Sequence, residues 1–505
     1  MLKLSITTPR PAGDPHPMQQ PTLTRRQFLS TTALATLALR SSPLRALAAP
    51  TTITVHTPSG ALRGEQSAGV NVFRGVPFAE PPVGPLRFRP PIPVKPWNIE
   101  SKPTESKPGE RDATRFAASA MQTGEPGIDH SEDCLYLNLW APAGKGPFPV
   151  YVWIHGGGFT GGHAFEPMYD GVILAQQGIL CVTVAYRLGV FGFLDLEPLL
   201  GPDYAGSANN ALRDLVSALQ WIHENIEAFG GDPSRVTIGG ESAGAKLTDI
   251  LMGVPSAQPL FQQMISESGG AERVWTRAQS QAVSQGFAGV WRAQTASDPV
   301  TILSAPADAL IQAQKQFIET WPQHFPLRCQ IDGSLLPLRP VESIAAGSSR
   351  AKRLLIGANR DESAAFLGPH PQKDPGPADL GNLSAADFAA VFKKYREVYP
   401  HMTAEQLRIR AVTAEEYWIP SLRAADAHLK GGGTAFVYRL DFAETGGYLR
   451  GYAFHSLDVR LVWDRPSPDA ANAQAEADLA LQMHHAWLAF LRGETPAAPN
   501  VPAWP

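Results

Sequence analysis

The sequence predicts an α/β fold, with a mostly parallel, twisted central sheet and helices on both of its faces. After residue 50, short β-like apolar runs alternate with helix-like stretches. Strands that alternate with helices form parallel sheets, because each helix returns the chain to the same end of the sheet. The clearest predicted strands cover residues 149–154, 179–185, 236–239, 264–266, 353–356 and 435–442. Apolar residues at 44% and charged residues at 18% indicate a globular protein with a sizeable core.

The clearest predicted helix covers residues 210–229, between the second and third of these strands. Apolar residues such as Leu212, Leu215 and Leu219 recur in it at three- and four-residue steps, and Gly230 follows it. A second apolar-periodic helix is predicted over residues 475–491. Each should bury one face against the sheet. No internal repeat or interdomain linker interrupts the pattern, so a single domain is expected.

Charge and cysteine content exclude several classes of protein. The formal net charge is −4 and no long Lys/Arg run occurs, so nucleic acid is not an expected partner. Three cysteines cannot form a disulfide framework, and Cys181 lies in a predicted strand, where we expect it to be buried. The chain has no C-x-x-C pair and no H-E-x-x-H spacing, so we predict no metal site.

Residues 1–48 are predicted to be a leader that is removed. Arg25-Arg26 precede a modestly apolar run over residues 31–39, and the small residues of Ala46-Leu47-Ala48 fit a cleavage site. The pattern is typical of a bacterial twin-arginine signal, so we expect the mature chain to be exported to the periplasm or the medium. The apolar run is too short for a permanent membrane anchor. A disordered leader with a chance Arg-Arg pair is the alternative.

The segment Gly240-Glu241-Ser242-Ala243-Gly244 follows a predicted strand and precedes a helix-compatible stretch. A G-x-S-x-G string in this context indicates a nucleophile elbow, a tight strand-to-helix turn that exposes the serine at the sheet edge. Glycines are needed two positions on either side because the turn leaves no room for side chains. Ser242 is therefore the candidate nucleophile.

A second glycine segment supports this interpretation. The predicted strand at residues 149–154 runs into His155-Gly156-Gly157-Gly158, where glycines let backbone N–H groups approach a reacting carbonyl. We expect Gly157 and Gly158, with Ala243 after the nucleophile, to form the oxyanion hole. The alternative, a glycine turn that binds phosphate, lacks the G-K-[ST] or G-x-G-x-x-G spacing.

An elbow of this kind requires an acid and then a histidine later in the chain. The acid candidates are Asp361 and Glu362, which follow the predicted strand at residues 353–356, and spacing alone does not separate them. The base candidate is His455, in competition with four other histidines downstream of the acid, His401, His428, His484 and His485. His155 and His163 precede the serine, so we interpret them as structural or pocket-lining residues.

Together these segments resemble the type-B carboxylesterases, the family of α/β-hydrolases that includes cholinesterases and bacterial nitrobenzyl esterases. The resemblance covers most of residues 51–505. Besides the elbow and the glycine segment, it rests on residues 73–77 (FRGVP), 80–88 (EPPVGPLRF), 131–138 (SEDCLYLN), 186–189 (YRLG) and 229–233 (FGGDP). It implies that Glu362 is the acid and His455 the base.

The same resemblance implies that residues 49–505 form one α/β-hydrolase domain with carboxylesterase activity. Ser242 would then attack a small-molecule ester, His455 would take its proton, and water would release the acid from an acyl-enzyme. No cofactor is required. Activity should fall in acid because His455 must be neutral, and we expect the nearby Glu362 to favour the charged imidazole.

Several positions depart from the family pattern. Ser363 and Ser456 replace the usual glycines after the catalytic glutamate and histidine. Further departures are Ala185, Leu215 and Glu267. Cys134 matches a family half-cystine whose partner region, residues 118–122, has no cysteine, so that disulfide is not expected. No aromatic residue lies between Met121 and Cys134 to bind a quaternary ammonium, which disfavours choline esters.

Two other functions use the same features. The triad could attack amides, which would make the chain an amidase or peptidase. A binding protein on this scaffold would be non-catalytic, although such relatives typically lack the nucleophile that is present here. The Pro-, Asp- and Gly-rich residues 372–380 are predicted to be a surface loop, with a lid as the alternative.

Overall fold

A computed structural model describes residues 50–97, 109–124, 127–368, 385–468 and 470–504. The predicted leader and the predicted loop at residues 372–380 lie outside the described residues. The strands are β1 Thr51–Thr57, β2 Gly60–Ser67, β3 Val70–Pro77, β4 Glu110–Asp112, β5 Ser119–Ala120, β6 His130–Ser131, β7 Tyr136–Pro142, β8 Phe148–Ile154, β9 Leu180–Val184, β10 Gly231–Glu241, β11 Gln263–Glu267, β12 Val274–Trp275, β13 Cys329–Gln330, β14 Arg353–Asn359 and β15 Thr434–Leu440.

The α-helices are α1 Val172–Gln176, α2 Gly189–Phe193, α3 Glu197–Leu200, α4 Asn210–Asn225, α5 Ala243–Leu251, α6 Arg277–Thr295, α7 Ala307–Thr320, α8 Pro340–Ala345, α9 Ala364–Leu367, α10 Ala385–Val398, α11 Ala404–Thr413, α12 Ile419–Lys430, α13 Leu457–Val462 and α14 Ala473–Leu491. The helix expected over residues 210–229 is α4, continued as a 3₁₀ turn over Ile226–Phe229 that ends at Gly230. A π-helix, Ala414–Trp418, joins α11 to α12.

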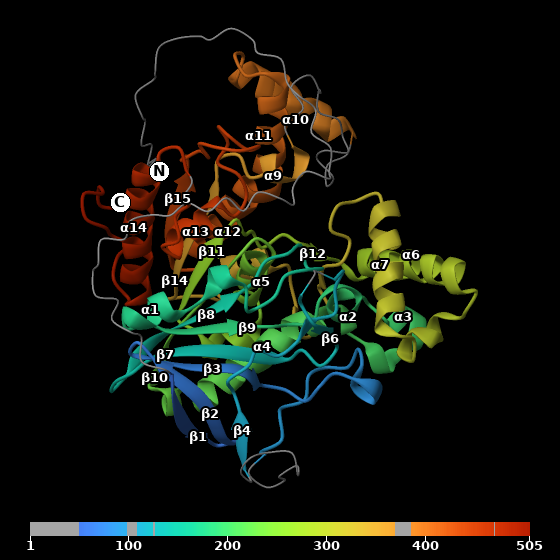
Figure 1. The fold of residues 1–505 in the computed structure, drawn as a ribbon. Coiled ribbons are helices and arrows are strands. Elements are labelled where there is room, and N and C mark those ends of the chain that lie inside the picture. Colours follow the sequence, from blue (N-terminus) through green and yellow to red (C-terminus); the bar gives the residue numbers. More distant parts are fainter. Residues whose placement is uncertain (1–49, 98–108, 125–126, 369–384, 469, 505) are drawn as a thin grey trace, which may run out of the picture.

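One large twisted sheet forms the centre of the molecule, in the order β1-β2-β3-β7-β9-β8-β10-β11-β14-β15. From β9 to β15 every neighbouring pair is parallel, whereas β1, β2, β3, β7 and β9 pair antiparallel. Figure 1 shows the antiparallel strands at one end of the sheet and β15 with α14 at the other. The prediction of an α/β fold with a mostly parallel sheet is confirmed.

Successive side chains along each strand point to opposite faces of the sheet, so the strands contribute to two hydrophobic cores. On β8, Val150 and Val152 pack into the core that contains α4 and α5. Tyr151 and Trp153 point to the opposite face, where they pack with residues of α1, α13 and α14. Such continuous apolar strands are expected where helices cover both faces of a sheet. Cys181 is fully buried in β9, as predicted.

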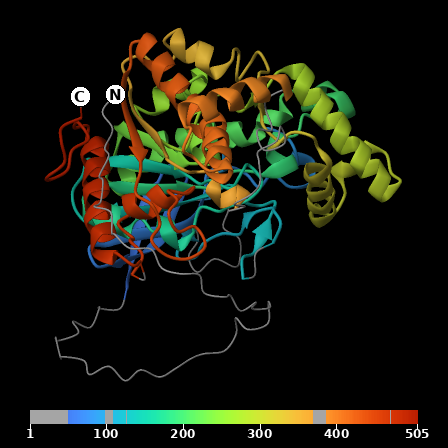
Figure 2. The same ribbon diagram turned by 90° about the horizontal axis from the view of Figure 1, so that it is seen from above.

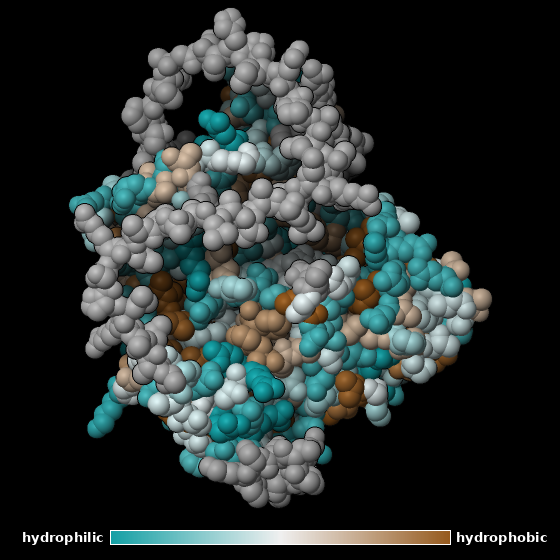
Figure 3. Space-filling model, in the orientation of Figure 1, coloured by the Kyte–Doolittle hydropathy of each residue, from teal (hydrophilic) through white to brown (hydrophobic). Residues whose placement is uncertain are grey.

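Helices α6 and α7 project from the side of the molecule away from α14 (Figure 2). On the face seen in Figure 3, hydrophilic side chains predominate and the apolar patches are small and separate. Among the described residues, no helix is both long and apolar enough to span a bilayer. The same residues contain no group of three or more His, Cys, Asp or Glu placed to hold a metal.

Candidate active site

Ser242 lies in the turn between β10 and α5, with the strained dihedrals φ 56° and ψ −120° of a nucleophile elbow. A Cβ at Gly240 would lie 2.3 Å from the carbonyl oxygen of Ile154, and one at Gly244 only 1.9 Å from the same oxygen. The predicted requirement for glycine on both sides of the serine is therefore steric. The Ser242 N–H donates to the Glu267 carbonyl at 2.9 Å, which fixes the turn to β11.

The glycine segment after β8 lies directly against this elbow. A Cβ at Gly156 would be 3.2 Å from the Ser242 Cβ. Gly157 has φ +112°, and its carbonyl accepts from the N–H groups of Thr160 and Gly161 at 3.1 and 2.9 Å. A Cβ at Gly158, which has φ +62°, would be 3.1 Å from the Phe325 ring. The structure thus places Gly156, which directly precedes the predicted oxyanion-hole glycines, against Ser242.

Glu362 and His455 meet at the carboxyl end of β14. The imidazole Nδ1 lies 2.6 Å from Glu362 Oε2. The other carboxylate oxygen, Oε1, accepts from the Ser268 hydroxyl at 2.5 Å and from the Asn359 N–H at 2.6 Å. Burial raises the pKa of Glu362 to about 7, and these two hydrogen bonds oppose the rise because they favour the ionised form.

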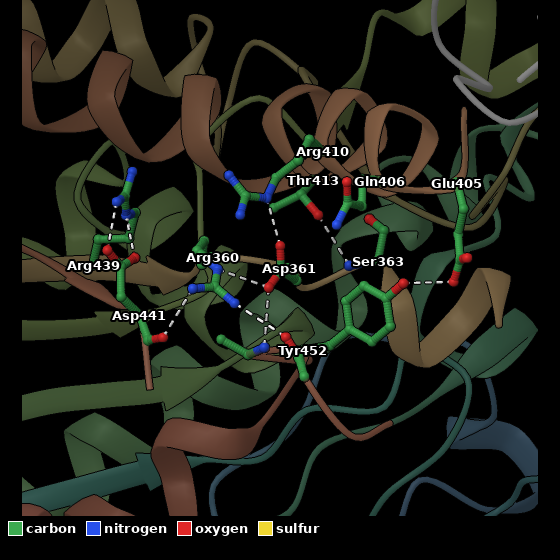
Figure 4. Close-up of polar contacts among 12 residues, drawn as sticks. Arg360, Asp361, Ser363, Glu405, Gln406, Arg410, Thr413, Arg439, Asp441 and Tyr452 are labelled. Atoms are coloured by element: carbon green, nitrogen blue, oxygen red, sulfur yellow. Dashed lines mark hydrogen bonds and ion pairs between the residues drawn. The ribbon is translucent and has the colours of Figure 1, made fainter. Parts of the chain in front are cut away.

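Asp361, the rival acid, has a different role. Figure 4 shows its carboxylate between Arg360 and Arg410, at 2.8 and 2.5 Å, and it also accepts from the Ala453 N–H at 3.1 Å. Asp361 therefore ties the loop after β14 to α11 and to the segment that carries His455. Spacing in the sequence could not separate the two acids. In the structure, Asp361 makes structural contacts between segments, and of the two acids it is Glu362 that contacts the imidazole.

The remaining imidazole nitrogen faces a second carboxylate. His455 Nε2 lies 3.0 Å from Glu241 Oε1, and among the described residues it has no hydrogen bond to Ser242 Oγ. The same Glu241 oxygen accepts from the Ser456 hydroxyl at 2.7 Å. Burial raises the pKa of Glu241 to about 7, while His455 and Ser456 act in the opposite direction. Glu241, a variable position inside the elbow motif for which the sequence predicted no role, is thus part of the site.

Burial also sets the proton affinity of His455. Its side chain is 8% exposed, and burial lowers its pKa below the ordinary value, although Glu241 pulls the pKa upward. Nearby carboxylates do favour the charged imidazole, but the expected net rise of the pKa does not occur, because loss of hydration around the charged imidazole outweighs their attraction.

Other histidines are occupied in structural contacts. His155 stacks on Tyr186 at 4.6 Å between ring centroids, and burial lowers its pKa to about 4, which agrees with a structural interpretation. His428 Nδ1 binds the Ser349 hydroxyl at 2.8 Å, and His484 Nδ1 binds the Val462 carbonyl at 2.7 Å. Within the described residues, His455 is the histidine that lies against Glu362.

Comparison with known proteins identifies the family of this chain. A model of the carboxylesterase family matches residues 51–505. The chain belongs to the carboxylesterase family. It is 34% identical to para-nitrobenzyl esterase of Bacillus subtilis, over 89% of this chain and 92% of that one. It is 33% identical to fumonisin B1 esterase of Sphingopyxis macrogoltabida, over 89% of this chain and 84% of the relative.

Solved structures place the fold in the same family. A para-nitrobenzyl esterase structure matches with a TM-score of 0.77 and 32% identity, over 90% of this chain and 93% of the other. The carboxylesterase of Geobacillus stearothermophilus matches with a TM-score of 0.77 and 33% identity, over 90% and 93%. The α/β-hydrolase fold is therefore confirmed, and this carboxylesterase acts on carboxylic esters with water as the second reactant.

Around the candidate triad of this carboxylesterase lie residues for which the sequence predicted no role. The Tyr417 ring, on the π-helix, lies 5.0 Å from the His455 ring, and the 58%-exposed Phe366 lies 4.9 Å from it. Lys246, one helical turn after Ser242, places Nζ 4.4 Å from the centre of the Tyr417 ring and 3.1 Å from the Ser268 carbonyl. The sequence feature that could have indicated a role for Lys246 is its position just after the candidate nucleophile.

Proposed function

We propose that this carboxylesterase cleaves esters through an acyl-enzyme, with Ser242 as nucleophile, His455 as general base and Glu362 as the acid that orients it. The observation that carries the proposal is the 2.6 Å contact of His455 Nδ1 with Glu362, on the sheet edge that also carries the strained Ser242. The chain order serine, glutamate, histidine is that of α/β-hydrolases.

In the first half-reaction, His455 Nε2 accepts the Ser242 proton while Oγ bonds to the ester carbonyl carbon. The carbonyl oxygen becomes an oxyanion held by N–H groups of Gly157, Gly158 and Ala243. The protonated imidazole then gives its proton to the departing alcohol. Because Nε2 lies 3.0 Å from Glu241 in the free protein, it must turn from Glu241 to Ser242 during this step.

In the second half-reaction, water attacks the acyl carbon while His455 again accepts a proton. The Ser242–acyl bond breaks, the proton returns to Ser242, and the carboxylic acid leaves. Glu362 holds one imidazole tautomer throughout and stabilises the imidazolium. The chemistry needs only the ester, water and these side chains.

The test is hydrolysis of a panel of p-nitrophenyl esters by the protein and its Ser242→Ala variant. We expect loss of at least about a thousandfold in kcat. Ser421→Ala is the matched control, because the Ser421 hydroxyl is buried without a hydrogen-bond partner among the described residues. A phosphonate ester should label the peptide that contains Ser242 in the parent but not in the variant.

Two outcomes would overturn the proposal in favour of its alternatives. A folded parent that hydrolyses anilides but no ester would be an amidase. A folded parent that is inert on esters and amides alike would be a binding protein on this scaffold.

We also propose that residues 1–48 direct export, from the Arg25-Arg26 pair and the apolar run that follows. Fractionation of a bacterium that expresses the full chain should place the mature protein outside the cytoplasm. Replacing both arginines by lysine should retain the protein inside, and unchanged export would contradict a twin-arginine route.

A further inference from the structure

A cluster of buried basic side chains lies beside the proposed site. It consists of Lys246 on α5, Arg273 after β11 and Arg328 before β13, and each side chain is less than a tenth exposed. Mutual repulsion between neighbours contributes to the lowered pKa of Lys246 and of Arg328, after burial itself. Buried cations are rare unless they are paired with an anion or serve a function.

The Arg328 side chain is engaged in contacts within the protein. Its Nε and Nη2 donate to the carbonyls of Phe325 and His324, both at 2.6 Å, and its guanidinium stacks 3.9 Å from the centre of the Trp275 ring. This arrangement fixes the turn at Phe325, which has φ +51°. Arg328 therefore holds Phe325 in place against Gly158.

Only part of the Arg273 guanidinium is engaged in contacts within the described part of the protein. Its Nη2 forms an ion pair with Glu416, but its Nη1 is buried and has no hydrogen-bond partner among the described residues. Of the other nearby carboxylates, Glu415 favours the charged guanidinium most, and Glu272 is bound to the more exposed Arg423 at 2.9 Å. An arginine with one occupied edge and one unsatisfied buried donor is suited to a planar anion.

The position of Arg273 connects it to the reacting atoms. Its guanidinium lies 5.5 Å from the centre of the Phe325 ring, which packs on the oxyanion-hole residue Gly158. On the other side, Arg273 opposes the rise that burial causes in the pKa of Tyr417, and the Tyr417 ring lies against His455. One aromatic ring thus separates Arg273 from each side of the catalytic centre.

Lys246 adds a second positive charge to the same place. Its Nζ sits over the Tyr417 ring and, within the described part of the chain, has one hydrogen bond, to the Ser268 carbonyl. Burial, and then Arg273, lower the pKa of Lys246 to about 7, so a substrate anion nearby would favour its charged form.

We propose that this carboxylesterase prefers esters whose acid portion carries a second, free carboxylate, which Arg273 binds with support from Lys246. The half-esters of short dicarboxylic acids are the substrate class. The acid portion is favoured over the alcohol because Phe325 joins Arg273 to Gly158, where the acyl carbonyl is held, whereas the alcohol leaves towards His455 Nε2. The inference rests on the proposed function of Ser242.

The experiment compares two substrates of matched shape, monoethyl succinate and ethyl 4-methylpentanoate, in which an isopropyl group replaces the carboxylate. We expect a higher kcat/KM for the succinate half-ester, mostly through KM. In Arg273→Met the preference should fall by about tenfold to a hundredfold, as for a lost charge-assisted hydrogen bond, while hydrolysis of the neutral ester persists. Arg423→Met, which removes an exposed arginine of the same region, should leave the preference unchanged.

Arg273→Met leaves Glu416 without its ion-pair partner, so the double variant Arg273→Met/Glu416→Gln, which removes both charges, keeps the test valid if the single variant does not fold. Free succinate should inhibit neutral-ester hydrolysis in the parent and inhibit the double variant at least about tenfold more weakly.

Three outcomes are decisive. A parent that hydrolyses the neutral ester with no preference for the half-ester overturns this inference but not the proposed function. A preference that survives in the Arg273 variants overturns the role of Arg273. Failure of the parent to hydrolyse either ester, together with no reaction on the p-nitrophenyl panel, overturns the proposed function itself.

Discussion

The Ser456 hydroxyl donates a 2.7 Å hydrogen bond to Glu241 Oε1, the carboxylate oxygen that also lies 3.0 Å from His455 Nε2. The residue after the histidine is thereby coupled to the residue before the nucleophile. Ser456 has φ +65°, a left-handed conformation that glycine adopts without strain. Ser456, found here in place of the family's usual glycine, is therefore in a strained backbone conformation, and its hydroxyl makes a contact with Glu241 that glycine could not make.

This contact predicts an effect of Ser456→Ala on the pH profile. The hydrogen bond from Ser456 lowers the pKa of Glu241, so its removal should make Glu241 more often neutral. A neutral Glu241 stabilises the imidazolium less, and the pKa of His455 should fall. The acid limb of kcat/KM should move to lower pH, by less than about one unit. A shift to higher pH would contradict the coupling. Ser363→Ala, which removes a buried hydroxyl without a hydrogen-bond partner among the described residues, should not move the limb.

A second prediction concerns the pH profile of the unmodified protein. His455 must be neutral to accept the Ser242 proton, and burial lowers its pKa. Below the pKa the imidazole is charged and inactive, so a lowered pKa extends activity to more acidic pH. The midpoint of the acid limb in kcat/KM should lie below about pH 6.5, the ordinary value for histidine. A midpoint clearly above that value would mean that the flanking carboxylates outweigh burial.

The central sheet could be predicted because its parallel strands are buried on both faces and appear as continuous apolar runs. Strands β8, β9, β11 and β14 were predicted within a few residues of their bounds. The antiparallel strands β1 and β2 were missed, since β1 is largely exposed and β2 alternates buried with partly exposed residues, with no long apolar run. Helix α6 was also missed, although Thr276 and Gln279 form a capping box at its start, which the sequence displays as T-x-x-Q.

The candidate site was predictable where one local motif fixes the geometry. The elbow around Ser242 and the glycine segment after β8 are of this kind. The contact between Glu241 and Ser456 spans 215 residues and depends on how two loops pack. The same holds for Arg273 and Tyr417, which the fold brings together from different segments. Periodicity and spacing contain no information on such pairs.

The two neighbouring acids give a third prediction. Glu362→Gln keeps the shape of the side chain but removes the acceptor that fixes the His455 tautomer, so kcat should fall by about a thousandfold to ten-thousandfold with little change in thermal stability. Asp361→Asn should instead reduce stability more than it reduces kcat. It weakens the contacts with Arg360 and Arg410 and should lower the free energy of unfolding by about 1–3 kcal/mol.

Thermal unfolding and steady-state kinetics on both variants separate these roles. Equal losses of kcat in Asp361→Asn and Glu362→Gln, at unchanged stability, would show that the two acids cannot be assigned by their contacts. A Glu362→Gln variant with parental kcat would remove Glu362 from the proposed triad.

The glycine segment gives a fourth prediction, on the backbone that we assign to the oxyanion hole. A Cβ at Gly157 would lie 2.0 Å from the carbonyl oxygen of Gly161, and φ +112° is strained for any other residue. Gly157→Ala must therefore displace this backbone, and kcat should fall by about a hundredfold to a thousandfold. Steady-state hydrolysis of a p-nitrophenyl ester, with circular dichroism to verify folding, is the measurement.

Gly161, in the same turn, provides the matched control for Gly157→Ala. A Cβ at Gly161 would approach the Gln122 side chain at 3.3 Å and the Gly157 carbonyl oxygen at 3.7 Å, and its φ lies outside the left-handed range. Gln122 Oε1, which accepts from the Gly162 N–H at 2.9 Å, has to shift by only a few tenths of an ångström, so Gly161→Ala should lose much less activity than Gly157→Ala. Equal activity of the two variants would place the oxyanion hole elsewhere, since only Gly157→Ala has to move the backbone beside Ser242.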